Sequence, residues 1–137
     1  MELADTSAWS NRHKAPTVRA EFDRRVTRGE IATCDMVKLE LLWTTRDQDD
    51  FVSARAELEM LPQIPIGETA WKRATDVFET LAAAGPLHHR RVRLPDLLIA
   101  ATAELAEVPL SHYDAHFELI AGVTGQPIRA IAPLGSL

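Results

Sequence analysis

The segment from Pro95 to about Glu107 constrains the fold of this chain more than any other. Proline suits the first turn of a helix, and the residues after it are apolar on almost every side of the helix that they predict. These apolar residues are Leu97, Leu98, Ile99, Ala100, Ala101, Ala103, Leu105 and Ala106. A helix with so little polar surface has to be covered by other elements, so we expect it to be central and buried.

Short apolar strands alternate with helices along the rest of the chain. We expect strands at residues 1–4, 30–34, 109–113 and 128–131, with 61–66 as a strand or an extended edge segment. We expect helices at 6–12, 16–28, 36–45, 47–60, 67–84 and 115–121, and a basic loop at 87–93. The alternation predicts an α/β fold in which a parallel sheet is covered on both faces. No linker interrupts it, so we expect one domain over residues 1–137.

Two local details of this pattern can be checked in a structure. Asp35 is a suitable N-cap for the helix that begins at Met36. In the helix at 67–84, Trp71 falls at helical spacing with Ala70, Ala74, Phe78 and Leu81, and Gly85 follows as a stop. We therefore expect Trp71 to lie on the apolar face of that helix.

Composition excludes several classes of protein. The formal net charge of −5 argues against a purely electrostatic nucleic-acid binder. Cys34 is the only cysteine, so no intramolecular disulfide can form, and we expect it to be a small core residue. No apolar run is long enough to span a bilayer, and the first residues lack the features of a signal peptide. We expect a cytoplasmic protein that does not bind membranes.

Three acidic residues lie where they could cap helices. Asp5 precedes the first helix, Asp96 follows Pro95 in the first turn of another, and Asp114 precedes a third. A carboxylate at such a position satisfies free backbone N–H groups and complements the helix dipole. Each of these acids, taken alone, therefore has a purely structural explanation.

Glu40 has no such explanation. Its neighbours at helical spacing are Met36, Val37, Trp43 and Thr44, so no cation offers it a local ion pair. A carboxylate in apolar surroundings is costly without a partner. Glu40 therefore needs a distant cation, a metal ion or water.

The four acids also share an expected location. Asp5 and Asp114 follow predicted strands, and Glu40 and Asp96 lie within the first two turns of helices on what we expect to be the same side. Ligands in open α/β sheets bind at the carboxyl ends of the strands. Converging carboxylates would repel one another without a hard cation such as Mg²⁺ or Mn²⁺ between them. Thr6 or Ser7 could donate a hydrogen bond to one of these carboxylates or to metal-bound water.

With these residues assembled, the chain resembles the PIN-domain family, and within it the VapC-type toxins of bacterial toxin–antitoxin pairs. The matching pieces are Asp5-Thr6-Ser7 after the first strand, Glu40 in a helix after the second, Leu94 to Ala103 around Asp96, and His112 to Phe117 around Asp114. They cover nearly the whole chain. The resemblance implies a three-layer α/β/α sandwich with a central, mostly parallel sheet of four or five strands.

The resemblance also implies a function. It implies an endoribonuclease that depends on Mg²⁺ or Mn²⁺, with Asp5, Glu40, Asp96 and Asp114 as catalytic metal ligands. Members act on transfer or ribosomal RNA, usually as homodimers, and are inhibited by a cognate VapB-type antitoxin. This chain has a short, less apolar first strand, and it has His116 where many relatives carry a second aspartate. His116 could therefore support the site or touch a metal or a phosphate itself.

Two basic clusters are candidates for RNA contact, although each could also consist of solvated charges. One follows Asp5 and the other precedes Asp96. The residues that we expect to contact RNA are Arg12, Lys14, Arg90, Arg91 and Arg93. If they do, cleavage should weaken steeply with salt. We do not expect His112 and His116 to form a helical zinc pair, because His112 lies in a predicted strand.

A set of apolar residues around the predicted helices at 36–45 and 47–60 is open to two interpretations. Its members either pack in the core or line a groove for an amphipathic antitoxin helix. They are Trp43, Phe51, Val52, Leu58, Met60 and Leu61.

Two other functions are compatible with parts of this pattern. One is a PIN-like module that binds RNA or protein and cleaves weakly or not at all, against which the complete acid set argues. The other is a Mg²⁺-dependent phosphoacceptor receiver domain. A receiver needs adjacent acids after its first strand and a late lysine, whereas Asp5 stands alone and Lys72 is the last lysine. No glycine-rich phosphate loop and no Ser or Cys nucleophile motif is present.

Overall fold

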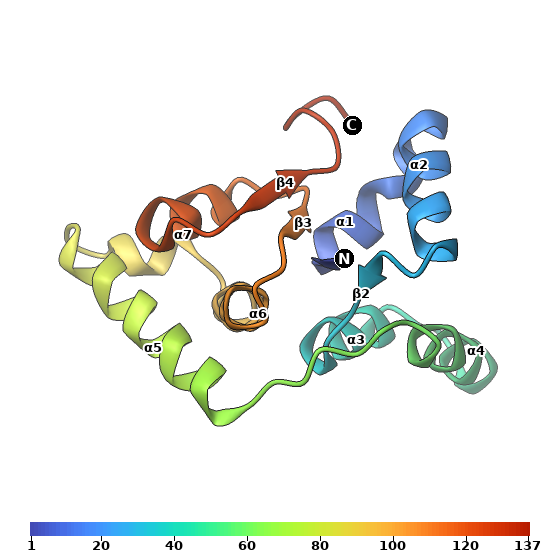
Figure 1. Cartoon of the computed structure of the whole chain (residues 1–137), viewed down its shortest axis with the longest axis horizontal. Coiled ribbons are helices and arrows are strands. Elements are labelled where there is room, and N and C mark those ends of the chain that lie inside the picture. The colour runs from blue at the N-terminus through green and yellow to red at the C-terminus, as the bar shows by residue number, and fades with distance from the viewer.

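Four short parallel strands form the sheet at the centre of the computed structural model, which describes residues 1–137 (Figure 1). They are β1 (Glu2–Ala4), β2 (Ile31–Ala32), β3 (Leu110–His112) and β4 (Ile128–Ala130), in the order β2-β1-β3-β4. Leu3 pairs with Ala32 on one side and with Leu110 on the other. Since β1 is an inner strand, the chain leaves it at the middle of the sheet's carboxyl edge.

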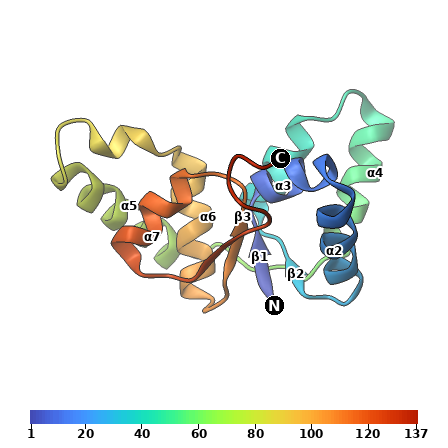
Figure 2. The same ribbon diagram turned by 90° about the horizontal axis from the view of Figure 1, so that it is seen from above.

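Helices cover both faces of this sheet. Figure 2 shows α5, α6 and α7 on one side of the strands and α1 and α2 on the other, while α3 and α4 lie below β2 in Figure 1. The helices are α1 (Thr6–Asn11), η1 (Arg12–Lys14), α2 (Pro16–Thr27), α3 (Asp35–Trp43), α4 (Gln48–Glu59), α5 (Glu68–Ala83), η2 (His88–Arg91), α6 (Leu94–Leu105) and α7 (His116–Thr124). The predicted three-layer α/β/α architecture with a parallel sheet is confirmed.

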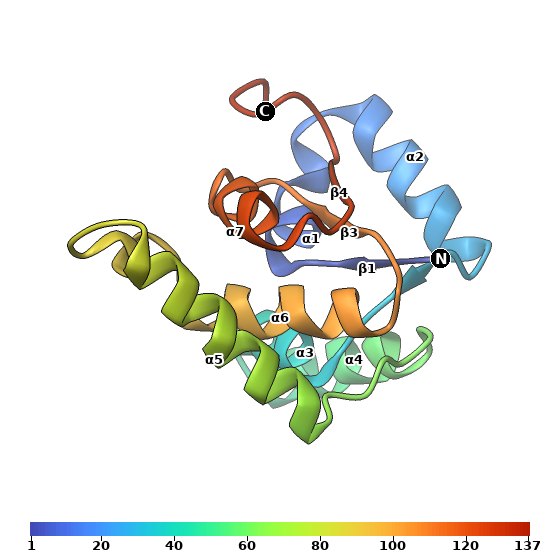
Figure 3. The same ribbon diagram turned by 60° about the vertical axis from the view of Figure 1, so that its left-hand side comes forward.

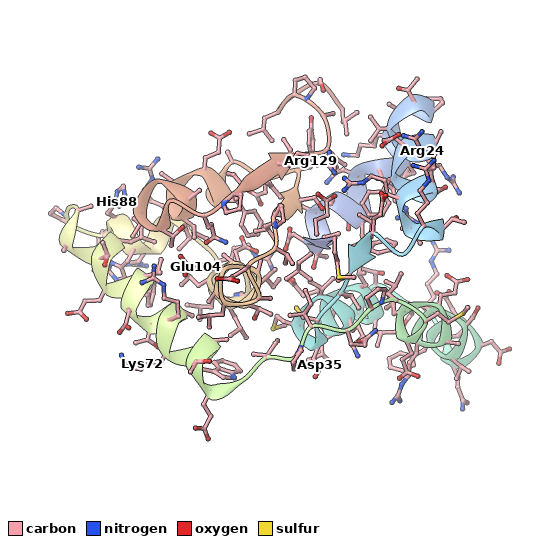
Figure 4. The ribbon with its side chains drawn as sticks, in the orientation of Figure 1. Arg24, Asp35, Lys72, His88, Glu104 and Arg129 are labelled. Atoms are coloured by element: carbon pink, nitrogen blue, oxygen red, sulfur yellow. The ribbon has the colours of Figure 1, made fainter.

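Helix α6 lies at the centre of the packing, as its sequence predicts. Eight consecutive residues, from Asp96 to Ala103, are buried. Figure 1 shows α6 end-on between α5 and the strands, and Figure 3 shows α5 running across it. Arg73 of α5 donates to Glu104 of α6, labelled in Figure 4, at 2.6 Å from Nε to Oε1. The ion pair lies at the end of an otherwise apolar contact.

The polar start of β1 is explained by two ion pairs of a buried carboxylate. The side chain of Glu2 is only 4% exposed. Its Oε1 accepts hydrogen bonds from Arg25 Nη1 of α2 at 2.6 Å and from Arg129 Nη2 of β4 at 2.5 Å. Figure 4 shows Arg129 on β4. Glu2 thus links α2 and β4 at the end of β1 that is farther from Asp5.

The second strand is shorter than the predicted segment 30–34. Only Ile31 and Ala32 belong to β2, and Thr33 makes a single parallel bridge to Gln63. The extended segment that contains Gln63 therefore lies at the sheet edge, as expected. It adds no full strand, because Pro62 and Pro65 lack the N–H groups that would continue the ladder.

Two predictions about helix details are wrong. Helix α3 begins one residue earlier than expected, so Cys34 is its N-cap and Asp35 instead pairs with Lys38 at 2.9 Å. Trp71 is 60% exposed, because α5 packs through Ala70, Ala74, Val77 and Leu81, which turns the residue after Ala70 toward solvent. The predicted loop at 87–93 contains the 3₁₀ helix η2.

None of the helices combines the length and the apolar character that crossing a bilayer requires.

Candidate metal centre

Asp5 is held rigidly where β1 passes into α1. It is the N-cap of α1, and its Oδ2 accepts hydrogen bonds from the backbone N–H of Ser7 at 2.8 Å and from Ser7 Oγ at 2.6 Å. Its other oxygen, Oδ1, is buried and has no partner. Desolvation by burial raises the pKa of Asp5, more strongly than these hydrogen bonds lower it. Asp5 is therefore a helix cap that keeps one oxygen available.

Ser7 also joins Asp5 to the far end of the chain. While its hydroxyl donates to Asp5, its oxygen accepts the backbone N–H of Tyr113 at 2.9 Å. The backbone N–H of Asp5 in turn donates to the carbonyl of Ser111 at 2.8 Å. The ends of β1 and β3 are thus fixed to each other beside the acidic residues.

Glu40 of α3 has the distant cation that its apolar surroundings require. Its Oε2 accepts a hydrogen bond from Arg93 Nη2 at 2.8 Å, and its Oε1 accepts one from Thr6 Oγ1 at 2.8 Å. The glutamate side chain is 12% exposed, whereas that of Arg93 is 56% exposed. The two partners leave Glu40 in a single orientation next to Asp5, whose pKa its charge helps to raise.

Asp96 is the most strongly perturbed acid. It lies in the first turn of α6 and is 2% exposed, and its Oδ2 is buried without a partner. Desolvation is the main reason that its pKa is raised to about 7, and the charge of Asp5 adds to the shift. Arg93 opposes the shift, while Asp114 and Glu40 contribute smaller increases. All four predicted acids therefore lie close enough to influence one another.

Asp114 and His116 complete the cluster after β3. Asp114 Oδ1 accepts the backbone N–H of His116 at 2.9 Å, which fixes the turn that leads into α7. His116 Nδ1 lies 3.4 Å from Asp114 Oδ1 and 3.9 Å from Asp96 Oδ2. One donor atom from each of these three residues falls within 4.8 Å of the others. Asp5 and Glu40 are not part of this tighter group.

The cluster has the properties of a cation site. Three atoms that could bind a metal ion are buried and have no hydrogen-bond partner: Asp5 Oδ1, Asp96 Oδ2 and His116 Nδ1. Buried acceptors without a donor are rare and costly unless a proton or a metal ion satisfies them. Carboxylate oxygens with one imidazole nitrogen are suitable ligands for a divalent ion, so the residues fit a metal.

A basic cavity opens beside the acids. Its volume is about 700 Å³, and it contains both His116 and Arg93. The residues that line it are Arg90, Arg91, Val92, Arg93, Ala115, His116, Glu118 and Leu119. Three of the five predicted RNA-contacting residues, Arg90, Arg91 and Arg93, therefore lie together next to the candidate metal ligands.

The structure does not bring Arg12 to this cavity. Its guanidinium lies over the Trp9 ring, 5.1 Å from the centroid, and 3.8 Å from Asp23. Arg12 instead lines a separate groove between α2 and α4. Lys14 is exposed at the end of η1. Arg12 and Lys14 therefore do not line the cavity that holds Arg90, Arg91 and Arg93.

His112 and Cys34 both have structural environments. His112 is 2% exposed, and its Nδ1 accepts the backbone N–H of Asp114 at 3.1 Å. Burial lowers its pKa. It therefore supports the turn that carries Asp114 and does not pair with His116 around a zinc ion. Cys34 is buried, which raises the pKa of its thiol, as expected for a core residue.

The apolar set on and directly after α3 and α4 is mostly exposed, so the core-packing interpretation is wrong for most of its members. Only Leu58 is buried. Leu58, Met60 and Leu61 line the groove between α2 and α4, which has a volume of about 730 Å³. The exposed members, with their exposed fractions, are Trp43 (88%), Phe51 (38%), Val52 (57%) and Met60 (86%).

A receiver-type phosphoacceptor site is not formed. Lys72, the last lysine, is exposed on α5 and pairs with Asp76 at 3.0 Å. It therefore cannot serve a phosphoryl group at Asp5 as the late lysine of a receiver would.

Comparison with known proteins gives a consistent set of relatives. A family model described as the PIN domain matches residues 3–123. Ribonuclease VapC18 of Mycobacterium tuberculosis is 38% identical over 133 residues, which cover 97% of this chain and 96% of that protein. Ribonuclease VapC21 of the same species is 35% identical over 98% of this chain and 96% of that protein.

Solved structures give the same result for the fold. The DNA-bound VapBC of Salmonella typhimurium aligns with a TM-score of 0.73 at 16% identity, over 96% of this chain and 100% of that chain. VapBC-5 of Mycobacterium tuberculosis, a toxin–antitoxin system, aligns with a TM-score of 0.60 at 24% identity, over 94% of this chain and 95% of that chain.

Proposed function

Because this chain belongs to the PIN-domain family, and within it to the VapC-type proteins, we propose that it is a metal-dependent endoribonuclease, the toxin of a toxin–antitoxin pair. One observation carries the proposal. Asp5 and Asp96, each 2% exposed, keep one carboxylate oxygen without any partner. Such oxygens are what a Mg²⁺ or Mn²⁺ ion needs, and relatives of similar length are named ribonucleases.

A divalent ion bound by Asp5, Asp96 and Asp114 would lower the pKa of a water molecule and offset the charge of an RNA phosphate. The protein's own residues supply the geometry for this chemistry. Ser7 fixes Asp5 so that Oδ1 stays free, and Thr6 holds Glu40 beside it. The ligands come from the junction of β1 and α1, from α6 and from the turn after β3, so the fold itself sets their spacing.

The basic cavity is the proposed RNA-binding surface. Arg90, Arg91 and Arg93 are exposed and line the cavity next to His116. Arg93 uses Nη2 to hold Glu40, and the remaining donors of its guanidinium can reach a phosphate oxygen. These charges offset the repulsion between an RNA backbone and a protein of net charge −5. Cleavage should therefore weaken as the salt concentration rises.

The test of this function is RNA cleavage by the purified full chain and by Asp96→Asn. We expect metal-dependent cleavage by the wild type, loss of cleavage in the variant, and loss in both with EDTA. Asp76→Asn, which alters an exposed acid on α5, is the matched control and should cleave normally. Undiminished cleavage by Asp96→Asn in EDTA would refute the proposed metal chemistry. Cleavage sites mapped on total RNA would identify the substrate, which we propose to be transfer or ribosomal RNA.

The groove between α2 and α4 is the proposed docking surface for a VapB-type antitoxin. It combines apolar side chains such as Leu58 and Met60 with Arg12, Asp23 and Glu57, which suits an amphipathic helix with a charged edge. Met60→Glu should weaken antitoxin binding in calorimetry without destabilising the free toxin, since Met60 is 86% exposed. Unchanged affinity would exclude this groove.

We also propose that the chain acts as a homodimer of one PIN-like domain per subunit. Leu39 and Trp43 are four residues apart on α3 and are 62% and 88% exposed, so they form an apolar stripe without a partner in the monomer. A second copy would bury such a stripe.

A further inference from the structure

We propose that His116 is itself a metal ligand through Nδ1, and that the site therefore prefers Mn²⁺ and similar transition ions to Mg²⁺. His116 would join Asp96 and Asp114, which the proposed function assigns to the ion together with Asp5, and would add one imidazole nitrogen to these carboxylate ligands. The inference rests on the proposed metal-dependent function and adds the class of ion that the site selects.

The distances fit a shared ion. His116 Nδ1 is 3.4 Å from Asp114 Oδ1 and 3.9 Å from Asp96 Oδ2. Two atoms that each bind one ion at about 2.1 Å lie about 3 to 4 Å apart, depending on the angle at the metal. The three residues are therefore nearly in ligating positions.

No hydrogen bond accounts for the buried Nδ1 atom of His116. Nδ1 is buried, and neither carboxylate satisfies it as a hydrogen-bond partner. Asp96 Oδ2 is also unpartnered, although Asp96 is 2% exposed. Asp96 Oδ2 of α6 and His116 Nδ1 of α7 are thus two potential metal-ligating atoms without hydrogen-bond partners, and they face each other across the space where an ion would bind.

The position of the ring is built into the turn after β3. The backbone N–H of His116 donates to Asp114 Oδ1, so the same residue contributes a hydrogen bond to one ligand and a side chain to the ion. His112 Nδ1 accepts the backbone N–H of Asp114 and braces this turn from the buried side. A preformed arrangement of this kind lowers the ordering cost of binding.

The imidazole determines which ion is favoured. Mg²⁺ prefers oxygen ligands and retains water, whereas Mn²⁺, Co²⁺ and Zn²⁺ accept imidazole nitrogen more readily. A site with aspartate in place of His116 would present oxygen atoms alone. His116→Asp should therefore shift the preference of this chain toward Mg²⁺.

The test is pulsed electron paramagnetic resonance of Mn²⁺ bound to the full chain, together with calorimetric affinities for Mn²⁺ and Mg²⁺. We expect a nitrogen coupling from a directly bound imidazole in the wild type and its loss in His116→Asp and His116→Gln. The ratio of Mn²⁺ to Mg²⁺ affinity should fall at least about tenfold in His116→Asp. His13→Asp, an exposed histidine on η1, is the control and should change neither measurement.

The outcomes separate this inference from the function on which it rests. Mn²⁺ binding without a nitrogen coupling, or a coupling that persists in both His116 variants, would overturn the assignment of His116 while leaving a carboxylate metal site. An unchanged affinity ratio in His116→Asp would overturn the proposed selectivity. Failure of the wild type to bind either ion would instead overturn the metal-dependent function.

Discussion

Replacing Asp96 by asparagine should stabilise the metal-free protein at neutral pH. Burial, together with the charge of Asp5, raises the pKa of Asp96 to about 7. The pKa of an aspartate in an unfolded chain is about 3.9, and each unit of difference corresponds to about 1.4 kcal/mol. The ionised carboxylate therefore lowers the free energy of unfolding by at most about 4 kcal/mol. Asparagine has the same shape and no charge, so it removes this penalty.

The stability that Asp96→Asn gains over the wild type should increase with pH. Below about pH 4, Asp96 is protonated in both the folded and the unfolded wild type, so its burial costs little. Between about pH 4 and pH 7 the unfolded chain loses this proton first, which favours unfolding of the wild type. The stability gained by Asp96→Asn should therefore grow across this range and stay constant above pH 7.

Urea denaturation followed by circular dichroism, in EDTA at pH 4.5 and pH 8, measures this difference. Asp76→Asn is the control and should change the free energy of unfolding by less than about 0.5 kcal/mol at either pH. Saturating Mn²⁺ should stabilise the wild type, by about 2.7 kcal/mol at one hundred times the dissociation constant, and leave Asp96→Asn unchanged. A variant less stable than the wild type at pH 8 in EDTA would show that Asp96 mainly stabilises the first turn of α6.

Three further predictions concern other parts of the molecule. Thr6→Val removes the hydrogen bond to Glu40 and should reduce cleavage about tenfold. The free energy of unfolding, measured on the same protein preparation as the cleavage rate, should change by only about 1 kcal/mol. Glu2→Gln removes the buried charge that pairs with the partly exposed Arg25 and Arg129 and should cost about 1 to 3 kcal/mol in urea denaturation; a normal cleavage rate is expected, because Glu2 lies at the opposite end of β1. Trp43→Glu should convert a dimer into a monomer in light scattering with little loss of thermal stability, and a persistent dimer would exclude α3 as the interface.

The sequence predicted the parts of the structure that depend on local pattern. Helix α6 could be recognised as central because its apolar residues leave no polar face, and the structure buries Asp96 to Ala103 without interruption. Asp5, Asp96 and Asp114 could be found because each follows a strand or opens a helix, and Glu40 could be found because no cation lies at helical spacing from it. The expected support from Thr6 and Ser7 is present as hydrogen bonds to Glu40 and Asp5.

The sequence could not predict contacts that depend on tertiary packing. Arg93 and Glu40 are separated by 53 residues, so no spacing rule identifies them as partners. Trp71 and Trp43 are apolar residues on helices that also bury other side chains, so composition alone did not reveal that both face solvent. Arg12 is near Asp5 in sequence, but its guanidinium packs on Trp9 in a different groove.

The hydrogen bond between Ser7 and Tyr113 has a consequence for when the protein becomes active during synthesis. It joins residues 106 positions apart, and the pairing of β1 with β3 likewise joins the two ends of the chain. Non-local pairing of this kind forms late, because the intervening chain must first be made and closed into a loop. A nascent chain that ends before β3 has Asp5, Glu40 and Asp96 but lacks Asp114 and His116. Ribosomes translating this message would therefore be exposed to an assembled acidic cluster only when most of the chain has emerged.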